Sequence, residues 1–253
     1  MLVPTLFIAV LGLLVGSFAA VVAHRVPIGA SPLTGRSRCD DYGATIAAYD
    51  NVPVLSWLLL RGRCRACGAA IPARYPLTEI AVAAGFAGSY LAFADDGWAA
   101  VALACVFIAM LATITLTDLS DRIIPNVVLG PTAVIGVALL ALGDADELPP
   151  HLLAAAIAGG LLFVVAMLYP RGMGMGDVKL AAVMGLYLGR AVAPALLIGF
   201  AAGALFGLAL IAGHGSGARK MKVPFGPFLA LGAVIALFAG DAIVDWYLDL
   251  FMR

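Results

Sequence analysis

The sequence predicts an all-α, polytopic membrane protein, and three observations point to that class: its composition, its long apolar segments and the placement of its basic residues. Hydrophobic residues make up 63% of the chain and charged residues only 12%, and the mean hydropathy is +1.06. A soluble domain carries about 25% charged residues. A chain this apolar needs a bilayer to cover its surface, where a spanning helix takes roughly 20 apolar residues.

Eight apolar segments are separated by polar or glycine-rich breaks, and each predicts a helix. The sixth and seventh are divided near Arg190 and Pro194, because one helix from 178 to 212 would be roughly 50 Å long, well beyond a bilayer core of about 30 Å. The sixth segment is then short, which predicts a half-membrane helix or one that extends into the glycine-rich stretch before it. The segments are Pro4–Ala23, Pro76–Ala94, Trp98–Thr117, Val127–Leu142, His151–Tyr169, Val178–Gly189, Val192–Ala212 and Phe225–Trp246.

The basic residues predict the orientation. If the N-terminus lies outside, every Lys and Arg except Arg190 and Arg253 falls in an inner loop, whereas the outer loops and tail carry mostly Asp and Glu. This is the positive-inside pattern. The first segment has no basic residue before it and ends in His24 and Arg25. A secretory signal peptide has the reverse polarity, so this segment predicts a retained helix.

One sizeable polar segment interrupts the apolar pattern. It predicts a division into a first transmembrane helix (1–24), a small cytoplasmic subdomain after it (25–75) and a membrane domain (76–253).

Three aspartates differ from the other acidic residues, because they adjoin membrane helices at the same inner face. Asp118 and Asp121 follow the third apolar segment, and Asp177 opens the sixth. Two carboxylates held close share one proton, so that one activates water as a base while the other protonates the leaving group. Gly174 and Gly176 before Asp177 lack Cβ atoms, which permits unusual backbone angles and close approach of a substrate backbone.

Other interpretations of Asp177 remain open at this point. An Asp in the first turn of a helix is an ordinary capping residue. An ion- or proton-coupled transporter also keeps a carboxylate within the membrane. Paired broken helices would favour a transporter, and the sequence shows one glycine-rich break.

An ordered set of motifs resembles the bacterial prepilin peptidases, also called type IV leader peptidases, which are intramembrane aspartic proteases of the GxGD type. The resemblance runs along nearly the whole chain. It is carried by Gly16-Ser17-Phe18, His24-Arg25-Val26-Pro27, the stretch from Tyr49 to Cys64, Cys64-Arg65-Ala66-Cys67, Arg74-Tyr75-Pro76-Leu77-Thr78-Glu79, Asp118-Leu119 with Ile124-Pro125-Asn126, Gly174-Met175-Gly176-Asp177, and the stretch from Val223 to Ala230.

The resemblance implies an aspartic endopeptidase in the bacterial inner membrane, with Asp118 and Asp177 as the catalytic pair and no cofactor for proteolysis. Its partners would be membrane lipid and type IV prepilins or pseudopilins, whose basic leader it removes, and no nucleic acid. Many such enzymes also methylate the new N-terminus with S-adenosylmethionine. Asp121 is the rival for the first catalytic role. Glu79 is assigned to the active-site region or the methylation site, and Gly174, Gly176 and Lys179 to supporting roles.

The cysteines depart from the family pattern. The family commonly has two CxxC pairs in the first inner loop, spaced for a tetrahedral zinc site, but here only Cys64 and Cys67 form an intact pair. Cys39 is followed by Asp40, Asp41 and Tyr42. Zinc on Cys39, Cys64 and Cys67 would need a fourth ligand such as Asp40 or Asp41, and the alternative is a set of reduced thiols. A methyltransferase or assembly factor that has lost proteolysis is a third hypothesis, which the intact aspartates oppose.

Overall fold

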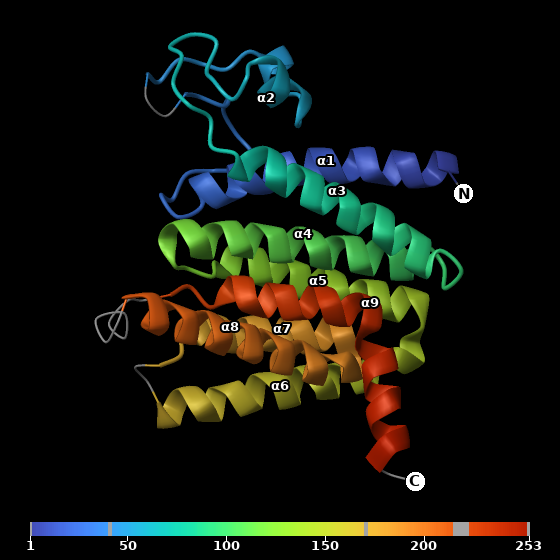
Figure 1. Ribbon diagram of the computed structural model, residues 1–253. Helices are drawn as coiled ribbons and strands as arrows, with labels where there is room; N and C mark the ends of the chain where they lie inside the picture. The colour runs from blue at the N-terminus through green and yellow to red at the C-terminus, as the bar shows by residue number, and fades with distance from the viewer. Residues whose placement is uncertain (1, 40–41, 170–171, 215–222, 252–253) are drawn as a thin grey trace. The chain divides into compact units, whose positions relative to one another are not determined.

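The computed structural model describes residues 2–39, 42–169, 172–214 and 223–251, and most of these residues are helical (Figure 1). Within the described residues, extended pairing is limited to two isolated bridges, Arg38–Thr45 and Arg63–Ala70. The all-α prediction is therefore confirmed. The chain divides into two compact units, Met1–Asp95 and Asp96–Arg253, which we call unit 1 and unit 2.

A long or medium helix covers each of the eight predicted apolar segments. Short helical turns add η1 (Ala48–Asn51), α2 (Leu55–Leu59), η2 (Ala145–Glu147) and η3 (Gly189–Ala191). The eight helices are α1 (Leu2–Arg25), α3 (Arg74–Phe93), α4 (Trp98–Asp121), α5 (Asn126–Gly143), α6 (Leu148–Leu168), α7 (Met175–Leu188), α8 (Val192–His214) and α9 (Gly226–Phe251).

Seven segments of the described chain are long and apolar enough to cross a membrane, which agrees with a polytopic membrane protein. One of them, Met175–Gly213, contains both α7 and α8. The helix breaks where Gly189 has a φ of +54°, close to the predicted break. At 14 residues, α7 is about 21 Å long, and it extends three residues into the glycine-rich stretch. The outside position of the N-terminus remains a prediction.

In unit 1, α1 and α3 pack closely because small residues meet along the pair. A Cβ added at Gly12 would lie 2.7 Å from the Ala83 Cα, and one added at Gly16 would lie 2.8 Å from the Glu79 Cα. Close backbone approach through glycine is the usual packing mode of membrane helices. The loop between α1 and α3 contains η1 and α2.

In unit 2, α4 and α7 are the most buried helices. Nine of the 14 residues of α7 and 12 of the 24 residues of α4 are buried. The fully buried side chains include Phe107, Ile114, Leu180 and Met184. A helix that is apolar all round belongs inside a bundle, and the outer helices α5, α6, α8 and α9 pack around these two (Figure 1). The two aspartates of the predicted pair lie at the ends of these buried helices.

The helices α7 and α8 run antiparallel, side by side (Figure 1). The middle of α8 lies near the start of α9, since a Cβ added at Gly203 would be 2.9 Å from the Phe225 ring. At the opposite end, Arg190 between α7 and α8 forms ion pairs with Asp241 and Asp245 of α9. Both aspartates of the predicted pair are therefore at the end of unit 2 opposite Arg190.

Candidate functional site

Asp118 lies in the last turn of α4 and is 6% exposed. Its Oδ2 accepts a hydrogen bond of 2.8 Å from the backbone N–H of Gly226, the first residue of α9. A Cβ added at Gly226 would lie 2.8 Å from the same oxygen. Only glycine therefore lets the α9 amide approach this carboxylate without displacing it.

Asp177 is the third residue of α7, and its Oδ2 accepts the backbone N–H of Gly174 at 3.2 Å. This is the ordinary capping contact of a first-turn aspartate. Gly174 has φ −80° and ψ 148°, which any residue can adopt, so the backbone freedom that glycine permits is not used there. Space is what the glycines provide, because a Cβ added at Gly176 would be 3.0 Å from the Ile124 Cβ.

The two carboxylates interact electrostatically with each other. Each is held through its Oδ2 by the amide of a glycine, Gly226 for Asp118 and Gly174 for Asp177. Two carboxylates fixed in this way can hold one shared proton, which is the state that acid–base cleavage needs.

The other residues predicted near the pair have different surroundings. Asp121 is exposed at the end of α4, where Arg122 follows in the left-handed conformation with φ +56°. Lys179 donates from Nζ to the Asn126 Oδ1 at 3.0 Å, which ties α7 to the first residue of α5. Glu79 belongs to unit 1, where its carboxylate contacts the loop.

Two turns of the unit 1 loop share one hydrogen-bond pattern, in which a cysteine amide donates to the carbonyl five residues on, and a glycine amide donates to the cysteine carbonyl. The bonds are Cys39 N to Ala44 O at 2.9 Å, Gly43 N to Cys39 O at 2.8 Å, Cys64 N to Ala69 O at 2.8 Å and Gly68 N to Cys64 O at 2.9 Å. Both glycines have positive φ. By position in the turn, Tyr42 corresponds to Cys67.

The two turns bring three thiols together. The sulfur atoms of Cys39, Cys64 and Cys67 all lie within 4.8 Å of one another, and the Cys39 and Cys67 sulfurs are 3.5 Å apart. Hydrogen bonds from the backbone amides of Cys67 and Ala66 lower the pKa of the Cys64 thiol. Three thiols that converge in this way fit a zinc ion. Asp40 and Asp41, the predicted fourth ligands, lie outside the described residues.

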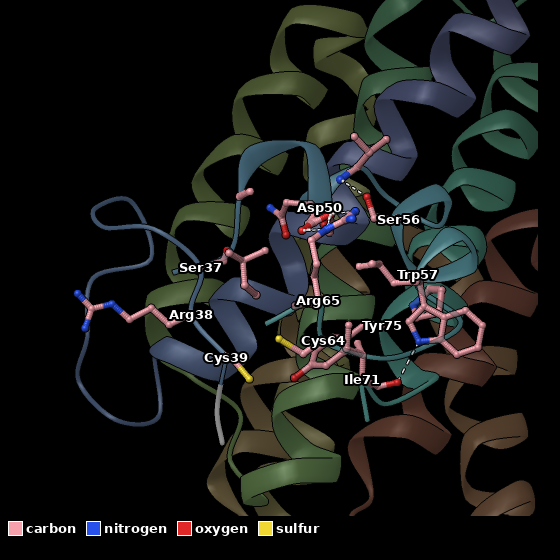
Figure 2. A pocket seen from close by; sticks show the side chains of 18 of the residues that line it. Ser37, Arg38, Cys39, Asp50, Ser56, Trp57, Cys64, Arg65, Ile71 and Tyr75 are labelled. Atoms are coloured by element: carbon pink, nitrogen blue, oxygen red, sulfur yellow. Dashed lines mark hydrogen bonds and ion pairs between the residues drawn. The ribbon is translucent and has the colours of Figure 1, made fainter. Parts of the chain in front are cut away.

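A cavity of about 570 Å³ opens between the loop, the His24 end of α1 and the Arg74 end of α3 (Figure 2). Asp50 lines it and pairs through both oxygens with Arg65, the shortest contact being 2.7 Å. Glu79 also lines it, is 7% exposed and accepts the Val54 N–H at 2.6 Å. The cavity thus has two carboxylates, both already oriented by a donor.

Two protein-family models match most of the chain. A family model described as the type IV leader peptidase family matches residues 105–211, and one described as the bacterial peptidase A24 N-terminal domain matches residues 10–93. Relatives named prepilin leader peptidase/N-methyltransferase include that of Bacillus subtilis (strain 168), 32% identical over 95% of this chain and 96% of its own. The chain belongs to the type IV leader peptidase family.

Further relatives with the same name agree with this membership. That of Aeromonas hydrophila is 35% identical and that of Stutzerimonas stutzeri is 33% identical, each over 95% of this chain and 92% of its own. No solved structure matches the chain. The resemblance seen in the motifs is thereby confirmed.

Two structural contacts at these sites were not predicted from the sequence, namely the Gly226 amide on Asp118 and the Val54 amide on Glu79. Tyr42 was expected to stand where the family has a second cysteine, and the matching turns at Cys39 and Cys64 agree with that position.

Proposed function

We propose that this protein is a prepilin leader peptidase, an aspartic endopeptidase that removes basic leader peptides from type IV prepilins or pseudopilins. One observation carries the proposal: Asp118 and Asp177 interact at one end of the two most buried helices, and each is anchored by a glycine amide. Family membership supports the same activity, and the comparisons give no support to a transporter. We further propose the cytoplasmic face of the inner membrane as the place of cleavage.

The chemistry assigned to the pair is general acid–base catalysis. The ionised carboxylate takes a proton from the attacking water, and its protonated partner polarises the scissile carbonyl and then protonates the leaving amine. The glycine amides stabilise negative charge on Oδ2 and hold each carboxylate in place. A substrate strand can approach closely over Gly174 and Gly176, which have no side chains.

Two further parts of the proposal concern unit 1. The relatives are named for N-methylation as well as for leader removal, and we assign N-methylation of the new N-terminus, with S-adenosylmethionine as donor, to this chain too. Cys39, Cys64 and Cys67 would hold a zinc ion, which would cross-link the two loop turns without taking part in cleavage. Residues 25–75 are in this view a small cytoplasmic subdomain.

The peptidase proposal is tested by leader removal from a co-expressed prepilin, followed as a gel mobility shift. Asp118→Asn and Asp177→Asn should each slow cleavage by at least about 10²–10⁴-fold, since acid–base groups contribute that much. Asp121→Asn, at the exposed end of the same helix, is the matched control and should cleave within about threefold of the wild type. Membrane insertion of each variant is checked by its level in membranes.

Activity kept in Asp177→Asn would overturn the assignment of the pair. Activity lost in Asp121→Asn but kept in Asp118→Asn would move the first catalytic role three residues along α4.

A further inference from the structure

We propose that the last part of α9, residues 241–251, does not span the membrane but lies in the membrane–water interface. Its apolar face rests in the headgroup region of a zwitterionic lipid leaflet, and its acidic stripe faces water and Arg190. This surface is at the end of unit 2 opposite the aspartate pair, where Arg190 contacts α9. It therefore serves a purpose other than cleavage, namely to hold the end of α9 at a fixed depth.

The spanning part of α9 ends near Gly240. Every buried residue of α9 lies between Gly226 and Gly240, and none of residues 241–251 is buried. A Cβ added at Gly240 would be 2.6 Å from the Ala191 Cβ, so this residue has reached the turn that contains Arg190. The stretch from Gly226 to Gly240 is about 22 Å long. Helix α7, with 14 residues, joins the same two ends of unit 2 over about 21 Å.

Beyond Gly240 the helix continues but changes direction. It runs to Phe251, and Figure 1 shows its C-terminal part turned away from the direction of the other helices of unit 2. Arg190 holds the turned part at the end of the bundle, through contacts of 2.7 Å with both Asp241 and Asp245. The segment therefore runs crosswise to the spanning helices, which is the direction of a membrane surface.

The segment is amphipathic. Its three aspartates are spaced four residues apart, which places them in one stripe along the helix, and all its other residues are apolar or aromatic. Four large side chains away from this stripe are more than half exposed, namely Trp246, Tyr247, Leu250 and Phe251. A helix with one polar stripe and one wide apolar face is the form that lies in a membrane interface.

The residue types of the segment indicate which lipid chemistry it fits. Trp and Tyr are enriched at the headgroup level of bilayers, because each has an apolar ring and a polar N–H or O–H. Residues 241–251 contain no Lys or Arg, whereas the interfacial helices that anionic lipids attract are rich in both. Three aspartates beside one arginine leave the surface acidic. It therefore fits zwitterionic headgroups, which do not repel it.

A second copy of the chain is the other occupant that an apolar face of this kind can have. Exposed apolar side chains continue along α9 before Gly240, for example at Leu231 and Ile235. This earlier part belongs to a segment long and apolar enough to cross a membrane, so lipid covers it. The apolar surface of residues 241–251 continues that lipid-covered surface, which favours lipid over protein as the occupant.

The test measures the depth of single tryptophans in the full chain, reconstituted in phosphatidylcholine vesicles. The lipid chains carry bromine, which quenches tryptophan fluorescence on contact, either near the headgroup or near the methyl end. Trp57→Phe and Trp98→Phe leave Trp246 as the sole tryptophan. Two further chains add Trp246→Phe together with Phe251→Trp or with Ala242→Trp.

The tryptophans at positions 246 and 251 should be quenched to a similar degree. Each should be quenched at least about twofold more by bromine near the headgroup than by bromine near the methyl end. The two positions would differ in depth by about 7.5 Å if the helix followed the membrane normal. Ala242→Trp is the matched control, because it lies beside the aspartate stripe. It should be quenched less by both lipids and more by iodide in the water.

A helix along the membrane normal gives the reverse order, with position 242 deepest and position 251 in water, and that order overturns the inference. Absence of quenching by either lipid at both 246 and 251 also overturns it, since water or another protein would then cover the face. Trp246 is a native residue, so its depth remains measurable if Phe251→Trp or Ala242→Trp fails to fold. Stronger quenching of Trp246 by bromine near the methyl end would likewise contradict the interfacial position.

Discussion

Unit 1 and unit 2 each hold two carboxylates in place with hydrogen-bond donors, yet they use those carboxylates differently. In unit 2, Asp118 and Asp177 interact with each other and each accepts a backbone amide. In unit 1, Asp50 is neutralised by Arg65 and Glu79 accepts the Val54 amide, and both line a cavity. Two neighbouring acids that share one proton suit proton transfer. Acids held at the wall of a cavity suit ligand binding.

The two units also differ in what stabilises them. Unit 2 has a core of fully buried side chains around α4 and α7, such as Phe107, stacked on Tyr187 at 4.9 Å. The loop of unit 1 is organised instead by hydrogen bonds, an ion pair and clustered thiols. A rigid apolar core keeps two acids at fixed positions relative to each other, whereas a polar loop can fold around a ligand or a metal. Four predictions test this contrast, beginning with the largest expected effect.

Gly226→Ala should reduce the initial rate of leader removal at least tenfold. The new Cβ would lie 2.8 Å from the Asp118 Oδ2, so either the carboxylate or the start of α9 must move, and misplaced catalytic groups are costly. Gly207→Ala in α8 is the control, because its Cβ would meet no atom within 4 Å. Wild-type cleavage by Gly226→Ala would show that the amide contact does not position Asp118.

Changes at the thiols should alter metal content without altering cleavage. Cys64→Ser should lower the zinc bound per purified chain, measured by mass spectrometry of the metal, whereas Cys105→Ser in α4 should leave it unchanged. Tyr42→Cys should slow zinc release to a chelator at least about tenfold, because it adds a fourth thiolate at the position equivalent to Cys67. Equal zinc content in wild type and Cys64→Ser would exclude a metal on this cluster.

Acid should loosen the loop of unit 1 through Asp50. Hydrogen bonds from Arg65 hold the pKa of the Asp50 carboxyl below its ordinary value of 3.8. A lowered folded-state pKa contributes stability that is present above the unfolded value and is lost as the pH falls through the folded value. Trp57 fluorescence, in a chain with Trp98→Phe and Trp246→Phe, should therefore change below about pH 4.

The control for the acid effect is Asp50→Asn, in which this part of the pH dependence should disappear. An identical pH profile in Asp50→Asn and its parent would mean that the Arg65 pair does not stabilise the loop.

Arg190→Gln should have the smallest effect, lowering the melting temperature of the chain by less than about 2 °C. Its partners Asp241 and Asp245 have side chains that are more than half exposed, as does Arg190 itself, and exposed pairs contribute little. Gly185→Val should lower the melting temperature far more, because even a Cβ there would be 2.6 Å from the Ala154 carbonyl oxygen. A larger fall in melting temperature for Arg190→Gln than for Gly185→Val would show that the exposed ion pairs stabilise unit 2 more than its close helix packing does.

Local patterns in the sequence determined the helices and the candidate acids. Hydropathy located all eight apolar helices to within a few residues, and the length of the segment from 178 to 212 required the break that Gly189 makes. These features depend only on residues that are neighbours in the sequence and on the thickness of a bilayer. The amino-acid sequence alone is therefore enough to predict them. The motifs around Asp118 and Asp177 likewise indicated the family before any fold was known.

Only the tertiary structure decided which distant backbone groups meet those acids. Gly226 is 108 residues from Asp118, and the Val54 amide reaches Glu79 over 25 residues. The cavity between the loop and the ends of α1 and α3 also forms only when these segments pack. Such contacts depend on which helix faces pack together and on how closely small residues let them approach. Neither hydropathy nor the spacing of residues along the chain predicts which faces will meet.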